Sequence, residues 1–162
     1  KHINLLNYDN TCYKFLTETD YVRSIKDCNY CVKSFIEKVH FNDDHPENMN
    51  IFISSIKSNY IMVYRDQKWN VVDRKKHIND MYEDNEVQLE SWYYEYKDKY
   101  PSIIESFKRY LNNREENEVI NRVKKDILLM LYNERNKVKE NYKRLIESQM
   151  LTPETYENME YI

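Results

Sequence analysis

HFNDDHPENMNIFI, residues 40–53, separates an apolar pattern typical of a helix from one typical of a strand. Its first part combines His, Asn, Asp, Glu and Pro, which favour turns and loops. A polar segment between two apolar elements is either a structural corner or a site. We expect residues 40–50 to form a corner in which Asn48 and Asn50 bond backbone groups of the helix before it and the strand after it.

Two helices and a short strand are expected before the corner. Residues 3–8 are apolar enough for an edge strand. Thr17 or Thr19 can cap a helix over residues 20–26, and Asn29 can cap another over 30–39. The second helix has an apolar face at helical spacing, made of Cys31, Val32, Phe35, Ile36 and Val39.

Three strands are expected after the corner, over residues 50–54, 60–65 and 68–73, because β-branched and aromatic residues dominate there. Asp66 and Gln67 lie between the last two strands with the spacing of a two-residue hairpin turn. The pattern predicts a three-stranded antiparallel meander.

The remainder of the chain has helical periodicity. We expect helices over residues 74–98, with an interruption at 83–85, and over 101–112, with Pro101 in the first turn. A single last helix over 116–148 would give residues 117–148 a length of about 48 Å. Val138, Tyr142, Leu145 and Ile146 on this arm would then have no partner within the domain, which predicts an interface.

The fold class is therefore predicted to be α+β: N-terminal helices, a three-stranded antiparallel meander, and a C-terminal helical bundle with a long last helix. Residues 1–73 would form the α+β part, 74–150 a helical part packed on it, and 151–162 a tail. We expect these parts to form one domain.

The composition excludes several classes of function. The chain has 162 residues and no Gly, which excludes glycine-dependent phosphate loops, dinucleotide fingerprints and nucleophile elbows. No apolar run approaches the roughly 20 residues that span a membrane. The three Cys, an odd number, and the absence of a secretion signal favour reduced thiols in a cytosol-like compartment. The chain begins with Lys rather than Met, which suggests a fragment of a longer protein.

The corner also carries a family resemblance, in His40-Phe41-Asn42, Pro46-Glu47-Asn48, Asn50-Ile51 and the later Lys68-Trp69. With the segment 131–136, these residues resemble a domain of uncharacterised proteins of nucleocytoplasmic large DNA viruses, over about residues 3–140. Related proteins often place this domain behind a zinc finger or near KilA-N-type DNA-binding domains. The resemblance implies a modular viral protein in the host cytoplasm or viral factory, and implies no activity. The structural motif is expected to comprise His40, Phe41, Asn42, Pro46, Glu47, Asn48, Asn50 and Trp69.

Two catalytic or metal-binding alternatives involve the same region. Cys28 and Cys31 form a CxxC pair followed by His40 and His45, which are residue types that bind zinc, although the spacing differs from that of a zinc finger. A metal-dependent nuclease would use the histidines with Asn42, Asn48 and Asn50, but a strand pattern follows where a ligand-bearing helix is needed. We expect neither a catalytic residue nor a metal or other cofactor.

The last helix provides the remaining candidates for a partner. Its basic residues predict contact with nucleic acid, at Lys124, Lys125, Arg135, Lys137 and Lys139, although interspersed acidic residues also fit a solvated face. Our first hypothesis is a non-enzymatic protein-interaction or oligomerisation module, forming a homo-oligomer or binding another viral or host protein. The alternative is a nucleic-acid-binding domain. No membrane partner is expected.

Overall fold

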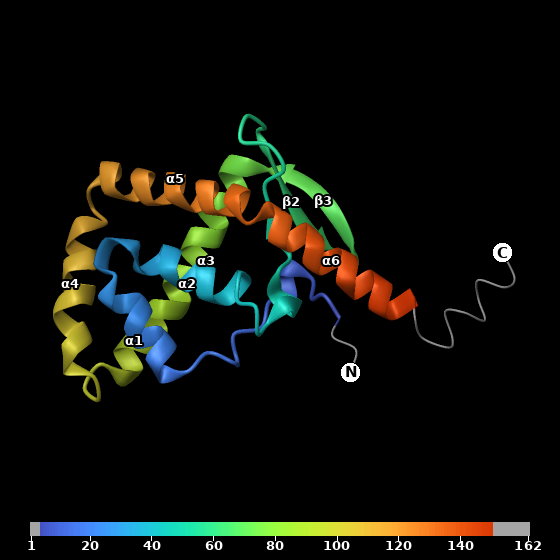
Figure 1. Cartoon of the computed structure of the whole chain (residues 1–162). Helices are drawn as coiled ribbons and strands as arrows, with labels where there is room; N and C mark the ends of the chain where they lie inside the picture. The colour runs from blue at the N-terminus through green and yellow to red at the C-terminus, as the bar shows by residue number, and fades with distance from the viewer. Residues whose placement is uncertain (1–3, 151–162) are drawn as a thin grey trace, which may run out of the picture.

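The computed structural model describes residues 4–150 and confirms the α+β class (Figure 1). A three-stranded sheet lies at one end of α2, helices α1, α3 and α5 pack against α2, and α6 lies along the sheet (Figure 1). No helix among the described residues has the length and apolar character needed to cross a membrane. The elements are α1 (Glu18–Lys26), α2 (Cys31–His40), β1 (Ile51–Phe52), β2 (Tyr60–Arg65), β3 (Lys68–Asp73), α3 (Arg74–Tyr96), α4 (Ile104–Asn113), α5 (Asn117–Asn133) and α6 (Arg135–Met150), with 3-10 turns η1 (Tyr8–Asn10), η2 (Cys28–Tyr30), η3 (Pro46–Asn48) and η4 (Pro101–Ile103).

The start of the chain differs from the prediction. Residues 4–7 form no strand, and η1 follows them. Their backbone bonds to the corner instead, because Leu6 N–H donates to the Glu47 carbonyl at 2.9 Å. Thr17 caps α1 in a reciprocal capping box. Asn29 does not cap α2; its side-chain oxygen accepts a hydrogen bond from Asn113 in α4.

The sheet has the predicted meander order, β1-β2-β3, with both pairs antiparallel. The hairpin turn places Asp66 and Gln67 at φ of 53° and 60°, which is the left-handed region that a two-residue turn of this kind requires. In a chain without Gly, other residues must occupy such positions. β1 is shorter than expected, because the N–H of Ile53 leaves the sheet and donates to the carbonyl of Leu131 at 3.3 Å.

α3 runs for 23 residues without the predicted interruption. Asn85 lies at the expected break but is buried, and its amide donates to the Met81 carbonyl one turn earlier. Its side-chain oxygen accepts a hydrogen bond from the Tyr13 hydroxyl. Both halves of this amide are therefore satisfied inside a continuous helix. The next helix begins near Pro101 as predicted, as the 3-10 turn η4 followed by α4.

The prediction of a single long last helix is wrong. The helix ends at Asn133, and α6 begins at Arg135 in a different direction (Figure 1). The carbonyl of Leu131, which would accept from residue 135 in a continuous helix, lies within hydrogen-bond distance of Ile53 N–H. Ile53, the residue after β1, thus competes for a carbonyl in the last turn of α5, and the bend lets α6 pack against the sheet instead of projecting as an arm.

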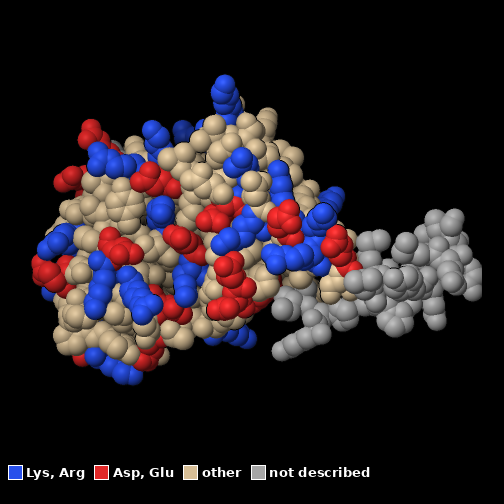
Figure 2. Space-filling view, in the orientation of Figure 1, with Lys and Arg blue, Asp and Glu red and all other residues tan. Residues whose placement is uncertain are grey.

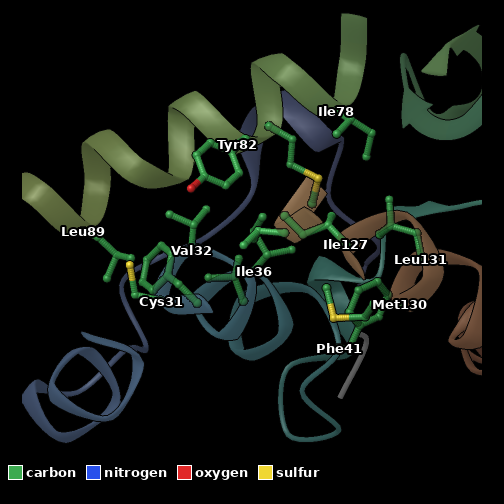
Figure 3. Packing of buried hydrophobic residues seen from close by; sticks show 14 of the residues in the cluster. Cys31, Val32, Ile36, Phe41, Ile78, Tyr82, Leu89, Ile127, Met130 and Leu131 are labelled. Atoms are coloured by element: carbon green, nitrogen blue, oxygen red, sulfur yellow. The ribbon is translucent and has the colours of Figure 1, made fainter. Parts of the chain in front are cut away.

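The core centres on α2, whose five predicted apolar residues are all fully buried. Figure 3 shows Val32 and Ile36 of α2 facing Tyr82 of α3 and Ile127 of α5. Close-packed contacts of this kind hold the helices in fixed relative positions. The surfaces described below are therefore built on rigid elements.

Candidate functional site

Asn48 bonds the helix before the corner as predicted, but its other partner, and both partners of the Asn50 amide, lie in the N-terminal segment and not in the strand after the corner. The Asn48 side chain is fully buried and bonds two distant segments. Its oxygen accepts the Cys12 N–H at 2.9 Å, and its amide donates to the carbonyls of Cys12 at 2.8 Å and Val39 at 3.1 Å. The Val39 bond satisfies a carbonyl in the last turn of α2, which has no partner in the helix itself.

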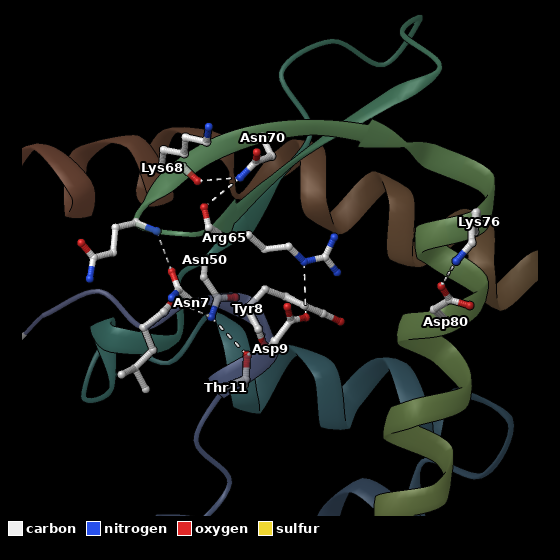
Figure 4. A network of polar contacts seen from close by, with 12 residues as sticks. Asn7, Tyr8, Asp9, Thr11, Asn50, Arg65, Lys68, Asn70, Lys76 and Asp80 are labelled. Atoms are coloured by element: carbon white, nitrogen blue, oxygen red, sulfur yellow. Dashed lines mark hydrogen bonds and ion pairs between the residues drawn. The ribbon is translucent and has the colours of Figure 1, made fainter.

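Asn50 and the hairpin hold the same N-terminal segment from the other side. The Asn50 amide donates to the Leu6 carbonyl at 3.2 Å and to the Thr11 hydroxyl at 3.1 Å (Figure 4). The Asn7 side chain accepts a hydrogen bond from Gln67 N–H in the hairpin turn at 3.0 Å. The N-terminal segment is therefore fixed by side-chain amides instead of strand pairing.

His40 lies beneath this segment, fully buried. Its Nδ1 is 2.9 Å from the Asn48 carbonyl, so Nδ1 carries the proton. Burial lowers the pKa of His40 to about 4, against the hydrogen bond to Asn48, which raises it. Nε2 of His40 and Oδ1 of Asn50 have no hydrogen-bond partner among the described residues. His40 is consequently a neutral core residue with no path to a substrate in solution.

His45 and Cys31, which belong to the zinc alternative, have other surroundings than His40. The His45 ring stacks on Phe15 at 3.7 Å between centroids and bonds Glu47. Cys31 is buried in the apolar core, which raises the pKa of its thiol. In residues 4–150, no three His, Cys, Asp or Glu side chains lie together as a metal site would require.

The expected interface on the last helix is largely covered from within the domain. Val138 is fully buried, and the Tyr142 ring meets Trp69 edge-on at 5.6 Å. Leu145 and Ile146 are half-buried and line a pocket of about 440 Å³ together with residues 4 and 5. The expectation that these residues lack intradomain partners is wrong for Val138 and Tyr142, because the bend in the helix brings α6 onto the sheet. Leu145 and Ile146 remain partly open at the pocket, and the interface itself stays a prediction.

The five predicted nucleic-acid contacts fall on two separate surfaces. Lys137 pairs with Asp43 at 3.2 Å and lies 3.7 Å from Glu134. Arg135 lies over the Tyr132 ring, and Lys139 lies over Phe52. Figure 2 shows acidic and basic side chains intermingled over this part of the molecule. These α6 cations therefore belong to a mixed surface on which each has a contact. Lys124 and Lys125 lie on α5, where the Lys124 ammonium also lies over a ring, 5.3 Å from the centroid of Tyr82.

Lys124 and Lys125 line a groove of about 600 Å³ between α5, the start of α3 and the open end of the hairpin. One face of α5 supplies residues at i, i+3, i+4 and i+7 spacing. The opposite wall comes from residues 59–60, 73–75 and 78–79. The full lining is Asn59, Tyr60, Asp73, Arg74, Lys75, Ile78, Asn79, Asn121, Lys124, Lys125 and Leu128. We call this surface the basic groove.

Arg74 shapes the wall of the basic groove. Its Nη1 donates to the carbonyls of Ile56 at 3.0 Å and Ser58 at 2.8 Å, and its N–H donates to the Asn59 carbonyl at 2.8 Å. These bonds hold the β1–β2 loop against the start of α3. The loop in turn presents Tyr60, whose side chain is 55% exposed.

The basic groove carries an excess of positive charge. Four cations line it, from Arg74, Lys75, Lys124 and Lys125, against the single carboxylate of Asp73. Asp73 is already engaged, because it accepts the Lys76 N–H as the cap of α3. Within residues 4–150, none of the four cations has an ion-pair partner. The groove can therefore bind an anion without first breaking an ion pair.

Comparisons with known protein families, curated proteins and solved structures find no match. Of the groove residues, the sequence pointed only to Lys124 and Lys125. Arg74 and Lys75 were missed, although Arg-Lys-Lys at a predicted helix start was a usable signal. Cations are disfavoured at the positive end of a helix dipole. The sequence indicates Tyr60 only as part of a strand. Periodicity cannot show which end of a strand the other elements leave uncovered.

Proposed function

We propose that this domain is a non-enzymatic nucleic-acid-binding module that holds phosphates in the basic groove. The observation that carries the proposal is the gathering of four cations without ion-pair partners around one groove, in a chain whose net charge is −3. Phosphate contacts by Lys and Arg supply most of the affinity of such modules. The guanidinium of Arg74 also adds a planar donor group suited to phosphate.

The start of α3 supports an anionic ligand independently of the count of charges. Its first turn contains Arg74, Lys75 and Lys76 and no acidic residue. Each such cation costs a few tenths of a kcal/mol against the helix dipole. A bound phosphate would offset this cost because it pairs with the cations, whereas the helix end itself is already capped by the Asp73 carboxylate.

Binding to a labelled oligonucleotide at several salt concentrations tests the proposal. The double variant Lys124→Glu/Lys125→Glu should weaken binding and lower the slope of log K against log salt by about 1.5, as expected for two lost phosphate contacts. The matched control is Lys143→Glu/Arg144→Glu, which makes the same change of charge at exposed positions on α6. Equal losses in both variants would show that net charge, and not the groove, governs binding.

A second candidate function is protein interaction, favoured by the free edge of the sheet. β3 has a neighbour on one side only among the described residues, and its central Val71 is 62% exposed. Exposed strand edges pair readily with another strand. A homo-oligomer through β3 should appear in light scattering and be lost in Val71→Lys. A protein that is monomeric at high concentration would refute self-pairing.

The resemblance to large DNA virus proteins is compatible with both candidates. We propose on that basis that the domain acts within a modular viral protein in the infected cell, as the binding part beside another functional domain. Purification of the natural full-length protein from infected cells, followed by identification of what remains bound, would test this context.

A further inference from the structure

The outer face of the β2–β3 hairpin is only half covered. The register places Tyr60 opposite Asp73, Met62 opposite Val71, and Tyr64 opposite Trp69. Residues directly opposite in an antiparallel pair share a face, so these three pairs form one strip along the hairpin.

α6 covers one end of this strip and leaves the other open. At the turn end, the Tyr142 ring lies 6.0 Å from Tyr64 and 5.6 Å from Trp69, measured between centroids. At the open end, Tyr60 and Val71 are 55% and 62% exposed. They are two of the five large hydrophobic residues that are exposed in the described part of the chain.

Tyr60 joins the open end of the strip to the basic groove. Its side chain lines the groove together with Arg74, Lys124 and Lys125. The main chain on both sides of Tyr60 is fixed, by the Arg74 bonds to the preceding loop and by pairing with β3. An exposed aromatic residue on a rigid strand is thus held beside cations that have no ion-pair partner in residues 4–150, with an apolar surface beyond it.

We propose that the ligand of the basic groove is a single-stranded nucleic acid with a base stacked on Tyr60. This inference rests on the function proposed above and specifies its ligand. A base has a planar π-face that stacks on an aromatic ring in any sequence. In a single strand the bases are free to turn towards Tyr60 and Val71 while the backbone lies along Lys124 and Lys125. In a duplex the faces of the bases are stacked on one another, so a duplex offers phosphates only.

Stacking gives Tyr60 a definite quantitative role. Loss of one base–aromatic stack costs about 1–3 kcal/mol, or roughly 5- to 150-fold in affinity. Tyr60→Ala should therefore weaken single-strand binding about tenfold or more and change duplex binding by less than about twofold. Tyr60→Phe keeps the ring and should retain the affinity for single strands. Because Tyr60 is largely exposed, these changes should leave the fold intact.

The test uses a labelled oligothymidine of about 12 nucleotides, within the range that one binding groove covers, and a duplex of equal length. Fluorescence anisotropy at low salt gives both affinities for the wild type and the variants. The matched control is Tyr94→Ala, because Tyr94 is 54% exposed and lies on α3 outside the groove. Thermal unfolding of each variant confirms that it is folded.

The outcomes separate this inference from the proposed function. Tight binding of the single strand that depends on Tyr60 and on Lys124 supports both. Equal binding of both nucleic acids, unaffected by Tyr60→Ala but weakened by Lys124→Glu/Lys125→Glu, overturns the single-strand inference and leaves the proposed function standing. Binding of neither nucleic acid overturns both. Displacement of the oligothymidine by polyglutamate at equal charge concentration would identify an acidic peptide as the ligand instead.

Discussion

Substitution of Asn48 tests whether the corner clamps the fold. Asn48→Ala removes three hydrogen bonds at once and leaves the Cys12 N–H and the carbonyls of Cys12 and Val39 without this partner. The Asn48 side chain is fully buried, so water can replace only some of these hydrogen bonds in the variant. The expected result is a large loss of stability without loss of a chemical activity.

The magnitude follows from the groups that are left unsatisfied. An unsatisfied buried backbone group costs about 1–3 kcal/mol. Cys12 is only partly buried and can regain a bond to water, whereas the Val39 carbonyl is buried. We therefore expect Asn48→Ala to lower the free energy of unfolding by about 3 kcal/mol. Asn48→Asp should cost at least as much, because a carboxylate would face two carbonyl oxygens.

Urea denaturation followed by circular dichroism measures these changes, provided that the slope with urea stays constant. Asn42→Ala is the matched control, because Asn42 lies in the same corner and makes one exposed bond to the Asp44 N–H. It should cost about 1 kcal/mol or less. The clamp would be refuted if Asn48→Ala were no more destabilising than the control, or if it left stability unchanged and abolished a binding activity.

Three further predictions concern other parts of the fold. The folded-state pKa of His40 is about 4, below the unfolded value of about 6.5. The contribution of neutral His40 to the free energy of unfolding should thus be complete above about pH 6.5. About 3 kcal/mol of that free energy should be lost as the pH falls from about 6.5 to 4. Urea denaturation at several pH values should show a smaller loss in His40→Gln. Val138→Glu should lower the melting temperature strongly, because it buries an unpaired charge. An unchanged melting temperature together with loss of a dimer would instead support an interface at Val138 on α6. Asp66→Asn/Gln67→Gly should stabilise the hairpin by about 1 kcal/mol in thermal unfolding, since both positions have positive φ.

Local signals account for the parts of the fold that the sequence predicted. The apolar face of α2, the helix cap at Thr17, one of the two Thr residues considered, and the two-residue turn at Asp66 and Gln67 each depend on residues close together in the chain. The structural role of Asn48 was also predictable, because a buried Asn in a turn needs backbone partners. That its partner would be Cys12, 36 residues away, was not.

Contacts between segments that are distant in the chain explain why the predictions for the last helix and the basic groove failed. Nothing in the sequence around Leu131 marks the end of α5, because Ile53, the residue after β1, takes part in ending it. The unbroken stripe of α5 and α6 therefore suggested a projecting arm, and with it a partner surface at Val138. The basic groove was hidden for the same reason, since its cations come from two helices about 50 residues apart in the chain.

The two groups of Asn residues separate architecture from candidate function in this chain. Asn48, Asn50 and Asn85 are fully buried, and each donates its amide to a backbone carbonyl. They cannot turn towards a ligand without leaving such a group unsatisfied. Asn59 and Asn121 line the basic groove and are exposed, and no hydrogen bond within residues 4–150 engages their side chains. Their amides can therefore bond a ligand of the basic groove without loss to the fold, whereas the buried corner amides cannot.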